Sequence, residues 1–204
     1  MSLKNIENSI LQKLTHRGRG YVFSGMEFLD LGNSAAVRQA LSRLTRAGTI
    51  RRIATGLYHY PAFNKMLGGE LPPSMDAVAK ALARRSDSRI VASGALAANR
   101  LGLSTQVPAK RVYLTNGKSR TVSVGRSTLA FRHVSPRRMA AEGETSTMVF
   151  EAFRYLGQEN ITDTIVNRLR RELPVEAKAE LRRDMPHASM WMRPLLKRVI
   201  EAGK

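Results

Sequence analysis

The segment "NSAAVRQALSRLTRAGTIRRIATGLYHYP", from Asn33 to Pro61, contains five arginines and no acidic residue. Asn33 or Ser34 can cap a helix at its start, and Gly48 can end that helix as the residue after its C-cap. The apolar residues between these two points follow the i, i+3, i+4, i+7 spacing of an amphipathic helix: Val37, Ala40, Leu41 and Leu44. After Gly48 the sequence alternates around Ala54-Thr55-Gly56, which predicts a β-hairpin.

The residues before this segment complete a recognisable order of elements. A helix is predicted over 5–14, a short strand over 21–24, and a second short helix after Ser24, whose capping box uses Glu27. Helix, strand, helix, turn, helix and hairpin within about 60 residues is the order of a winged helix-turn-helix. We therefore predict such a domain over residues 1–61.

The face of the third helix opposite its apolar stripe carries polar and cationic side chains. Arginine can contact guanine with two hydrogen bonds, glutamine can contact adenine in the same way, and serine can contact phosphate. The hairpin adds two arginines where a wing would meet the DNA backbone. An ordinary solvated helix is the alternative, but such helices mix charge signs to gain i, i+4 ion pairs. The predicted DNA-binding residues are Ser34, Arg38, Gln39, Ser42, Arg43, Arg46, Arg51 and Arg52.

The whole chain is strongly basic, since 34 Lys and Arg against 16 Asp and Glu give a formal net charge of +18 over 204 residues. Its 43% hydrophobic content is ordinary for a globular protein. Such a surplus is best explained by a polyanionic partner, with nucleic acid favoured over an anionic membrane. Residues 1–60 carry 9 cations and 3 acids, residues 61–134 carry 12 and 3, and residues 135–204 carry 13 and 10. We therefore expect the polyanion-facing surface before residue 135.

Other classes of protein are disfavoured by what the sequence lacks. No apolar run approaches the roughly 18–20 residues of a membrane-spanning helix, and the absence of cysteine fits a reducing cytoplasm. The histidines lack metal-ligand spacing, and the acids form no pair suited to acid–base chemistry. We therefore expect a cytoplasmic protein that is not an enzyme, with no catalytic residue, metal or cofactor.

The rest of the chain predicts a linker over 62–73, an α/β domain over 74–157 and a helical C-terminal extension over 158–204. Three strands are expected over 111–115, 121–124 and 127–134, forming a small antiparallel sheet with one apolar and one polar, cationic face. Tyr113 is expected on the polar face. The fold class is thus α+β. A secondary basic surface, which either extends the DNA footprint, binds an acidic partner or simply faces solvent, would comprise Arg111, Arg120 and Arg132.

Two stretches resemble the AbiEi-type antitoxins, in the short bacterial branch of that family. These are "RRIATGLYHYP" (51–61) and "SGALAANRLGLSTQVPAKRVYLTNG" (93–117), within a similarity that runs from about Gly20 to Gly157. The resemblance implies a winged helix-turn-helix that represses its own operon by binding promoter repeats. It also implies a second domain, beginning after Pro73, that neutralises a nucleotidyltransferase-like toxin. Applied to this sequence, the resemblance implies that the recognition helix spans residues 34–47 and that the wing spans residues 49–60. The helices predicted after Gly157 depart from the pattern of that family.

Two further hypotheses belong to other classes. The first is an RNA-binding or ribosome-associated protein, in which the basic sheet with Tyr113 would contact RNA. The second is an enzyme acting on nucleic acid, which would need clustered carboxylates with a metal. Only three acids lie between residues 61 and 134, which argues against the enzyme. By analogy with winged repressors, we expect a homodimer on the repeated DNA sites.

Overall fold

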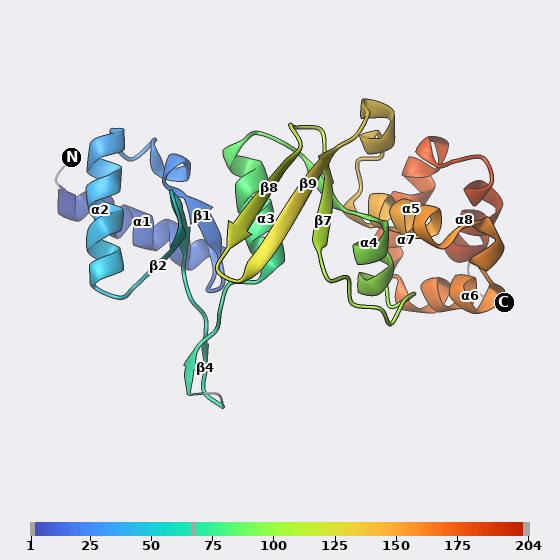
Figure 1. Ribbon diagram of the computed structural model, residues 1–204, viewed down its shortest axis with the longest axis horizontal. Coiled ribbons are helices and arrows are strands. Elements are labelled where there is room, and N and C mark those ends of the chain that lie inside the picture. Colours follow the sequence, from blue (N-terminus) through green and yellow to red (C-terminus); the bar gives the residue numbers. More distant parts are fainter. Residues whose placement is uncertain (1–2, 67, 202–204) are drawn as a thin grey trace. The chain divides into compact units, whose positions relative to one another are not determined.

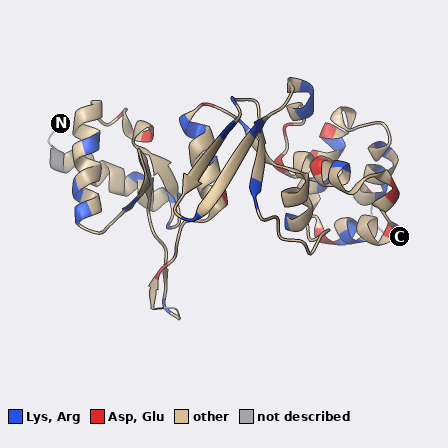
Figure 2. Cartoon of the chain, in the orientation of Figure 1, with Lys and Arg blue, Asp and Glu red and all other residues tan. Residues whose placement is uncertain are grey.

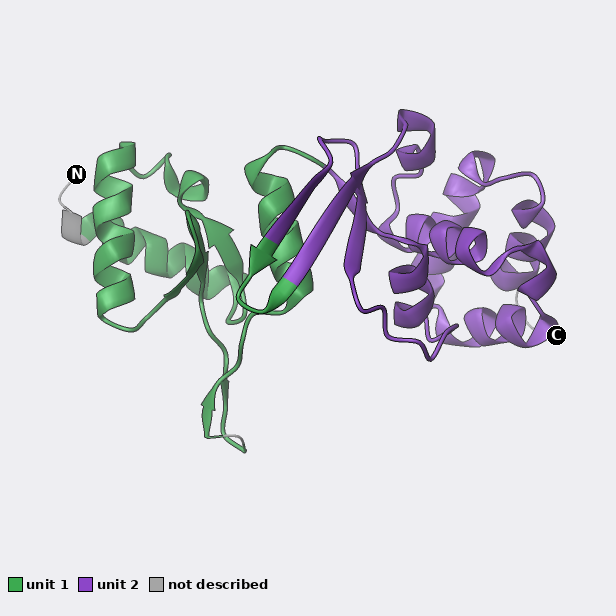
Figure 3. Cartoon of the chain, in the orientation of Figure 1, with its two compact units in different colours: residues 1–88, 123–127 green, residues 89–122, 128–204 purple. Residues whose placement is uncertain are grey.

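The computed structural model describes residues 3–66 and 68–201 and is a mixed α+β fold, with eight α-helices among those residues (Figure 1). The predicted α+β class is confirmed. The chain forms two compact units (Figure 3). Unit 1 comprises residues 1–88 with 123–127, and unit 2 comprises residues 89–122 with 128–204.

Unit 1 contains the elements predicted for the N-terminal region, in the predicted order. Its three-stranded antiparallel sheet has the order β1-β3-β2, and a second, two-stranded hairpin occupies much of the segment that was predicted as a linker. The elements are α1 (Leu3–Arg17), β1 (Val22–Ser24), the 3₁₀ helix η1 (Gly25–Phe28), α2 (Ser34–Arg46), β2 (Arg51–Ala54), β3 (Leu57–His59), β4 (Phe63–Asn64), β5 (Gly69–Glu70) and α3 (Met75–Arg85).

Helix α2 is fixed by its cap, its apolar stripe and its glycine stop. The side chain of Asn33 accepts a hydrogen bond from the amide of Ala36 at 2.9 Å, so Asn33 is the cap. Gly48 follows the helix with a φ of 76°, a left-handed conformation that glycine adopts without strain. The predicted stripe is buried against α1 and η1, where each buried Leu contributes about 1.5–3 kcal/mol. The residues of this core are Ile6, Ile10, Leu14, Phe23, Phe28, Val37, Ala40, Leu41, Leu44 and Ile50.

Helix α3 belongs to unit 1, although the sequence predicted a domain boundary before it. Arg84 explains the attachment, because its Nη2 donates to the carbonyl oxygen of Val22 at 2.7 Å and its Nε lies 3.4 Å from a Glu27 carboxylate oxygen. The same guanidinium lies over the ring of Tyr21, 5.0 Å from its centroid. Burial and the hydrogen bond to Glu27 raise the pKa of Tyr21 to about 12. Long-range contacts of this kind leave no local signal in the sequence.

Unit 2 combines a helical subdomain with a four-stranded sheet, except that the β8–β9 turn and the strand ends beside it (residues 123–127) belong to unit 1. The sheet has the order β6-β7-β9-β8. Residues 158–204, which were predicted to be helical, contain α6 to α8, and α5 precedes them. The elements are β6 (Ile90–Ala92), α4 (Gly94–Arg100), β7 (Arg111–Thr115), β8 (Arg120–Val124), β9 (Ser127–His133), η2 (Pro136–Met139), α5 (Glu144–Leu156), η3 (Gln158–Asn160), α6 (Asp163–Glu172), α7 (Val175–Asp184), η4 (Met185–His187) and α8 (Met192–Ile200).

The predicted antiparallel sheet is wrong in one pairing. Strand β9, not β8, lies beside β7, and it runs parallel to β7 with Tyr113 opposite Phe131. The tight turn between β8 and β9, at Gly125, makes these two strands neighbours, so β8 becomes the edge strand. The register also places Tyr113 on the Phe131 face, where it is 2% exposed and its ring stacks on Phe131 at 5.9 Å. The predicted polar position of Tyr113 is therefore wrong as well.

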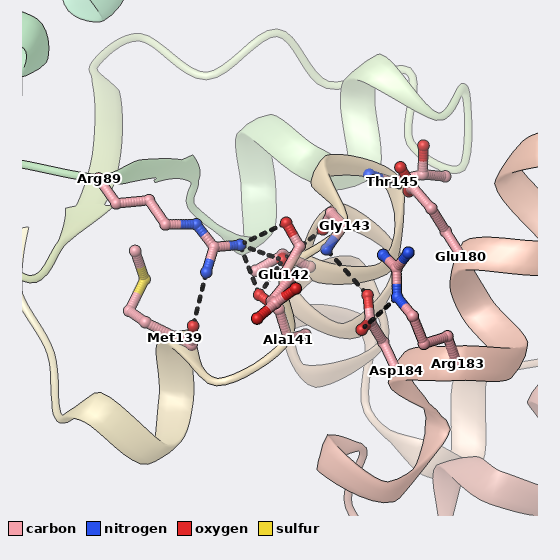
Figure 4. Close-up of polar contacts among 10 residues, drawn as sticks. Arg89, Met139, Ala141, Glu142, Gly143, Thr145, Glu180, Arg183 and Asp184 are labelled. Carbon is pink, nitrogen blue, oxygen red and sulfur yellow. Dashed lines mark hydrogen bonds and ion pairs between the residues drawn. The ribbon is translucent and has the colours of Figure 1, made fainter.

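A polar network orders the segment between η2 and α5 (Figure 4). The guanidinium of Arg89 donates to three successive parts of this segment, the carbonyl oxygens of Met139, Ala141 and Glu142. From the other side, the buried carboxylate of Asp184 accepts the amide of Gly143 at 2.9 Å. Burial alone would raise the pKa of Asp184, but the hydrogen bonds from the backbone outweigh burial and lower it. Charged side chains thus satisfy backbone groups that the segment itself leaves unpaired.

Replacing Asp184 with alanine is expected to destabilise unit 2 by about 1–3 kcal/mol at pH 7, because the Gly143 amide loses its acceptor. A lowered folded-state pKa stabilises the protein above the unfolded pKa, and this contribution disappears as the pH falls through the folded pKa. The difference between the wild type and the variant should therefore be largest at neutral pH and shrink below about pH 4. Urea unfolding at pH 7 and pH 3 measures it. Glu176→Ala, at an exposed position of α7, is the control, and an equal loss there would contradict the argument.

Candidate nucleic-acid interface

All eight residues predicted to bind DNA lie exposed in unit 1, and six of them share the outer face of α2. Figure 2 shows the Lys and Arg positions along α2 in blue. Each of these six is separated from the buried stripe by the helical periodicity, so none of the guanidiniums turns into the core. The six are Ser34, Arg38, Gln39, Ser42, Arg43 and Arg46.

The three arginines of α2 differ in what holds them. Arg38 and Arg46 make only long contacts at 3.3 Å within the helix, from Arg38 Nε to the Ser34 carbonyl and from Arg46 Nη2 to the Ser42 hydroxyl. Arg43 forms an ion pair with Glu7 of α1 at 3.3 Å, and its side chain remains 45% exposed. Exposed pairs of this kind contribute about 0–1 kcal/mol, so Arg43 can exchange Glu7 for a contact with DNA at little cost.

The β2–β3 hairpin presents its two arginines next to α2. Arg51 donates to the Gly48 carbonyl at 2.8 Å and to Glu70 of β5 at 2.9 Å. Arg52 is exposed, and like Arg38 and Arg46 it has no ion pair among the residues that the structure describes. The segment from Asn33 to Pro61 is acid-free in sequence, but the fold brings Glu7 and Glu70 to it from outside. Three of its five arginines keep an uncompensated charge.

A groove of about 480 Å³ joins the exposed face of α2 to η1 and the hairpin turn. Three arginines line it, Arg38 and Arg52 of the predicted set and Arg85 of α3. Arg85 was missed by the sequence reasoning, because it lies beyond the predicted linker. Its Nη1 donates to the Thr55 carbonyl in the hairpin turn at 3.0 Å, which brings it to the groove. The groove also has exposed apolar side chains from η1 and its end, Met26 and Leu29.

The three arginines predicted as a secondary basic surface are exposed, but they do not form one surface. In the parallel register Arg111 shares a face with Tyr113 and Phe131, whereas Arg132 pairs opposite Leu114 and lies on the other face. Arg120 is on the first face, since its guanidinium lies 5.2 Å from the Phe131 ring centroid. The sheet therefore places Arg111 and Arg120 on one side and Arg132 on the other.

Two other kinds of site are absent from the described ranges 3–66 and 68–201. No group of three or more His, Asp or Glu side chains there is arranged to hold a metal ion. None of the helices in these ranges has the length and apolar character needed to cross a membrane.

Comparison with known proteins places the sequence in a family. Residues 9–181 match the model of a family of unknown function, DUF6088. A search of curated proteins gives no match. The family match extends from α1, through the sheets of both units, into α7. Since it covers far more than half of the sequence, the chain belongs to the DUF6088 family.

Proposed function

We propose that unit 1 is a winged helix-turn-helix domain that binds double-stranded DNA through α2 and the β2–β3 hairpin. The observation that carries the proposal is the uncompensated charge of Arg38, Arg46 and Arg52, which are exposed on one helix and the adjoining hairpin. In this assignment η1 takes the place of the second helix, α2 is the recognition helix and the hairpin is the wing.

The exposed face of α2 suits the major groove chemically. Arg38 and Gln39 near the start of the helix can reach base edges, as the first turns of a recognition helix do. Arg46 near its end, and Arg52 on the wing, would contact phosphates and fix the orientation of the helix. Arg43 would reach a base edge once it has left Glu7, and Arg51 would add a phosphate contact after exchanging Glu70 for the DNA backbone.

The resemblance to AbiEi-type antitoxins extends this proposal to a biological role. The protein would repress its own operon as a homodimer on promoter repeats, and would neutralise a nucleotidyltransferase-like toxin. It would act in the cytoplasm by binding rather than by catalysis. The antitoxin role depends on a neighbouring gene that encodes such a toxin, and an operon without one would leave a plain transcriptional regulator.

The RNA-binding alternative loses its main support. That hypothesis had the basic sheet with Tyr113 contact RNA, but Tyr113 is 2% exposed and packs on Phe131. Base stacking needs an accessible aromatic face. Arg111 and Arg132, the cations expected around it, lie on opposite faces of the sheet.

Binding to duplex DNA is expected to weaken steeply with salt. If the three arginines assigned to phosphates, Arg46, Arg51 and Arg52, each neutralise one phosphate, the slope of log affinity against log salt is about −2.7. Raising the salt from 50 to 200 mM then lowers affinity about 40-fold. Fluorescence anisotropy with a labelled fragment of the protein's own promoter measures the slope. A slope near zero, or tighter binding to structured RNA of equal length in competition, would contradict the proposal.

A further inference from the structure

We propose that unit 2 contains a second, separate binding site: a pocket for a small molecule that carries a diphosphate or a similar cluster of phosphate charges. The pocket has a volume of about 420 Å³. It lies between η2, α5 and the turn that leads into α8, and none of its residues belongs to the proposed DNA-binding set. Four arginines line it: Arg137, Arg138, Arg154 and Arg193.

The charge of this pocket is local and is only partly compensated. Residues 135–204 carry 13 cations and 10 acids, so a cluster of arginines is not a consequence of overall basicity here. None of the described residues that line the pocket is acidic. The nearest compensation is Glu151, which has a fully buried side chain and is shared by Arg138 and Arg154. Four guanidiniums and one carboxylate leave a surplus of three positive charges around one concave surface.

Three of the four guanidiniums are held in place before any ligand arrives. Arg138 donates through Nε and Nη2 to the two oxygens of Glu151 at 2.9 and 2.6 Å. Arg154 Nη1 donates to Glu151 at 2.7 Å. Arg193 donates through Nη2 to the Pro186 carbonyl at 2.9 Å. Because a guanidinium has five N–H donors, each of these three arginines keeps free donors for a ligand. Their side chains are already held in place, so they lose little conformational entropy when a ligand binds.

The remaining features favour phosphate over other anions. Arginine forks match the geometry of phosphate oxygens, and a surplus of three charges matches a diphosphate better than a single carboxylate. Arg137 is exposed, and its side chain makes no hydrogen bond or ion pair among the described residues, so the guanidinium is available to bind the ligand. The volume is in the range of small-molecule sites. Met190, 75% exposed at the rim, offers an apolar surface to an organic group attached to the phosphates.

Isothermal titration of the full-length protein with inorganic pyrophosphate, ADP, adenosine and citrate tests the proposal. Pyrophosphate and ADP are expected to bind one per chain, while adenosine, which lacks phosphate, is not. Arg137→Ala should weaken pyrophosphate binding about tenfold or more, because a charge-assisted hydrogen bond is lost without disturbing an internal contact. Arg193→Gln should weaken it similarly, and thermal unfolding of each variant verifies that it remains folded.

Two controls separate this site from the proposed DNA interface and from general basicity. Arg171→Ala, on α6 outside the pocket, removes one charge and should leave pyrophosphate binding unchanged. The Arg38→Ala/Arg43→Ala variant should lose DNA affinity and keep pyrophosphate binding, so either proposal can fail alone. Absence of pyrophosphate binding at low salt, equal weakening by Arg171→Ala, or citrate binding as tightly as pyrophosphate would each overturn the phosphate pocket.

Discussion

Replacing Arg38 and Arg43 together with alanine is expected to abolish the preference of the protein for its operator over unrelated duplex DNA. Each arginine that contacts a base edge contributes about 1–3 kcal/mol, so the pair should cost about 2–6 kcal/mol at the specific site. At about 1.4 kcal/mol for each factor of ten, this is a loss of about thirtyfold or more. Binding to unrelated DNA should fall less, because Arg46, Arg51 and Arg52 still contact phosphates.

The structure divides this effect unequally between the two side chains. Arg38 lines the groove and makes only one long contact, to the Ser34 carbonyl at 3.3 Å. Arg43 must first leave Glu7, so Arg38→Ala alone should cost more than Arg43→Ala alone. Glu7→Gln removes the carboxylate that competes with DNA for Arg43. It is expected to strengthen DNA binding by about 0–1 kcal/mol, which is the usual contribution of an exposed ion pair.

Anisotropy titrations with the promoter fragment and with a scrambled duplex of the same length measure both affinities. The matched control is Arg171→Ala/Arg182→Ala, which removes two positive charges from exposed positions on α6 and α7. This control should retain the preference for the operator, with at most a small loss of affinity for both duplexes. If the Arg38/Arg43 variant keeps its preference, or if the control loses as much, α2 is not the reading helix.

The N-terminal half of the fold was largely predictable from sequence because its signals are local. The capping residue Asn33, the stripe from Val37 to Leu44 and the stop at Gly48 are all encoded within one short segment, and all three are found in the structure. The exposure of the arginines followed from the same periodicity. Their ion pairs with Glu7 and Glu70 did not, because those contacts are made by residues distant in sequence.

Unit 2 shows where sequence patterns are insufficient. The alternation of apolar and polar residues located β7, β8 and β9, but it carries no information on the order of these strands in the sheet. A parallel pairing of β7 with β9 reverses the face of Tyr113 relative to Phe131 without changing the pattern of either strand. Likewise, Arg138, Arg154 and Arg193 are scattered over more than 50 positions and meet only after folding.

Replacing Glu151 with alanine should produce the largest loss of stability in unit 2, about 3–5 kcal/mol, because it breaks a buried charge network from its centre. The Glu151 side chain is fully buried, and it is flanked by Arg138 and Arg154, which are only 34% and 27% exposed. The same carboxylate raises the pKa of Arg138. Without it the guanidinium still remains charged, because arginine is not deprotonated in proteins. The positive charges of Arg138 and Arg154 would then face the cavity left by the Glu151 side chain. Their mutual repulsion would be strong there, because the dielectric constant is lower than in water.

The single tryptophan makes this measurement specific for unit 2. Trp191 is partly buried and stacks on Phe153, a core residue of the helical subdomain, so its fluorescence follows the unfolding of that core in denaturant. Glu172→Ala, which breaks an exposed pair with Arg168, is the control and should cost less than about 1 kcal/mol. Glu151→Gln keeps the side-chain volume and one hydrogen-bond acceptor, so its loss of stability should lie between those of Glu151→Ala and Glu172→Ala.

A triple variant tests whether it is the unpaired charge, rather than the missing side chain, that destabilises the protein. Replacing Arg138, Glu151 and Arg154 together with Met, Leu and Met removes both cations along with the acid. Buried ion networks replaced in this way by apolar side chains of similar volume are often neutral in stability. The triple variant should therefore recover most of the stability lost in Glu151→Ala, while losing pyrophosphate binding because two of the four pocket arginines are gone. Equal instability of the triple and single variants would show that the unpaired charge is not what destabilises Glu151→Ala.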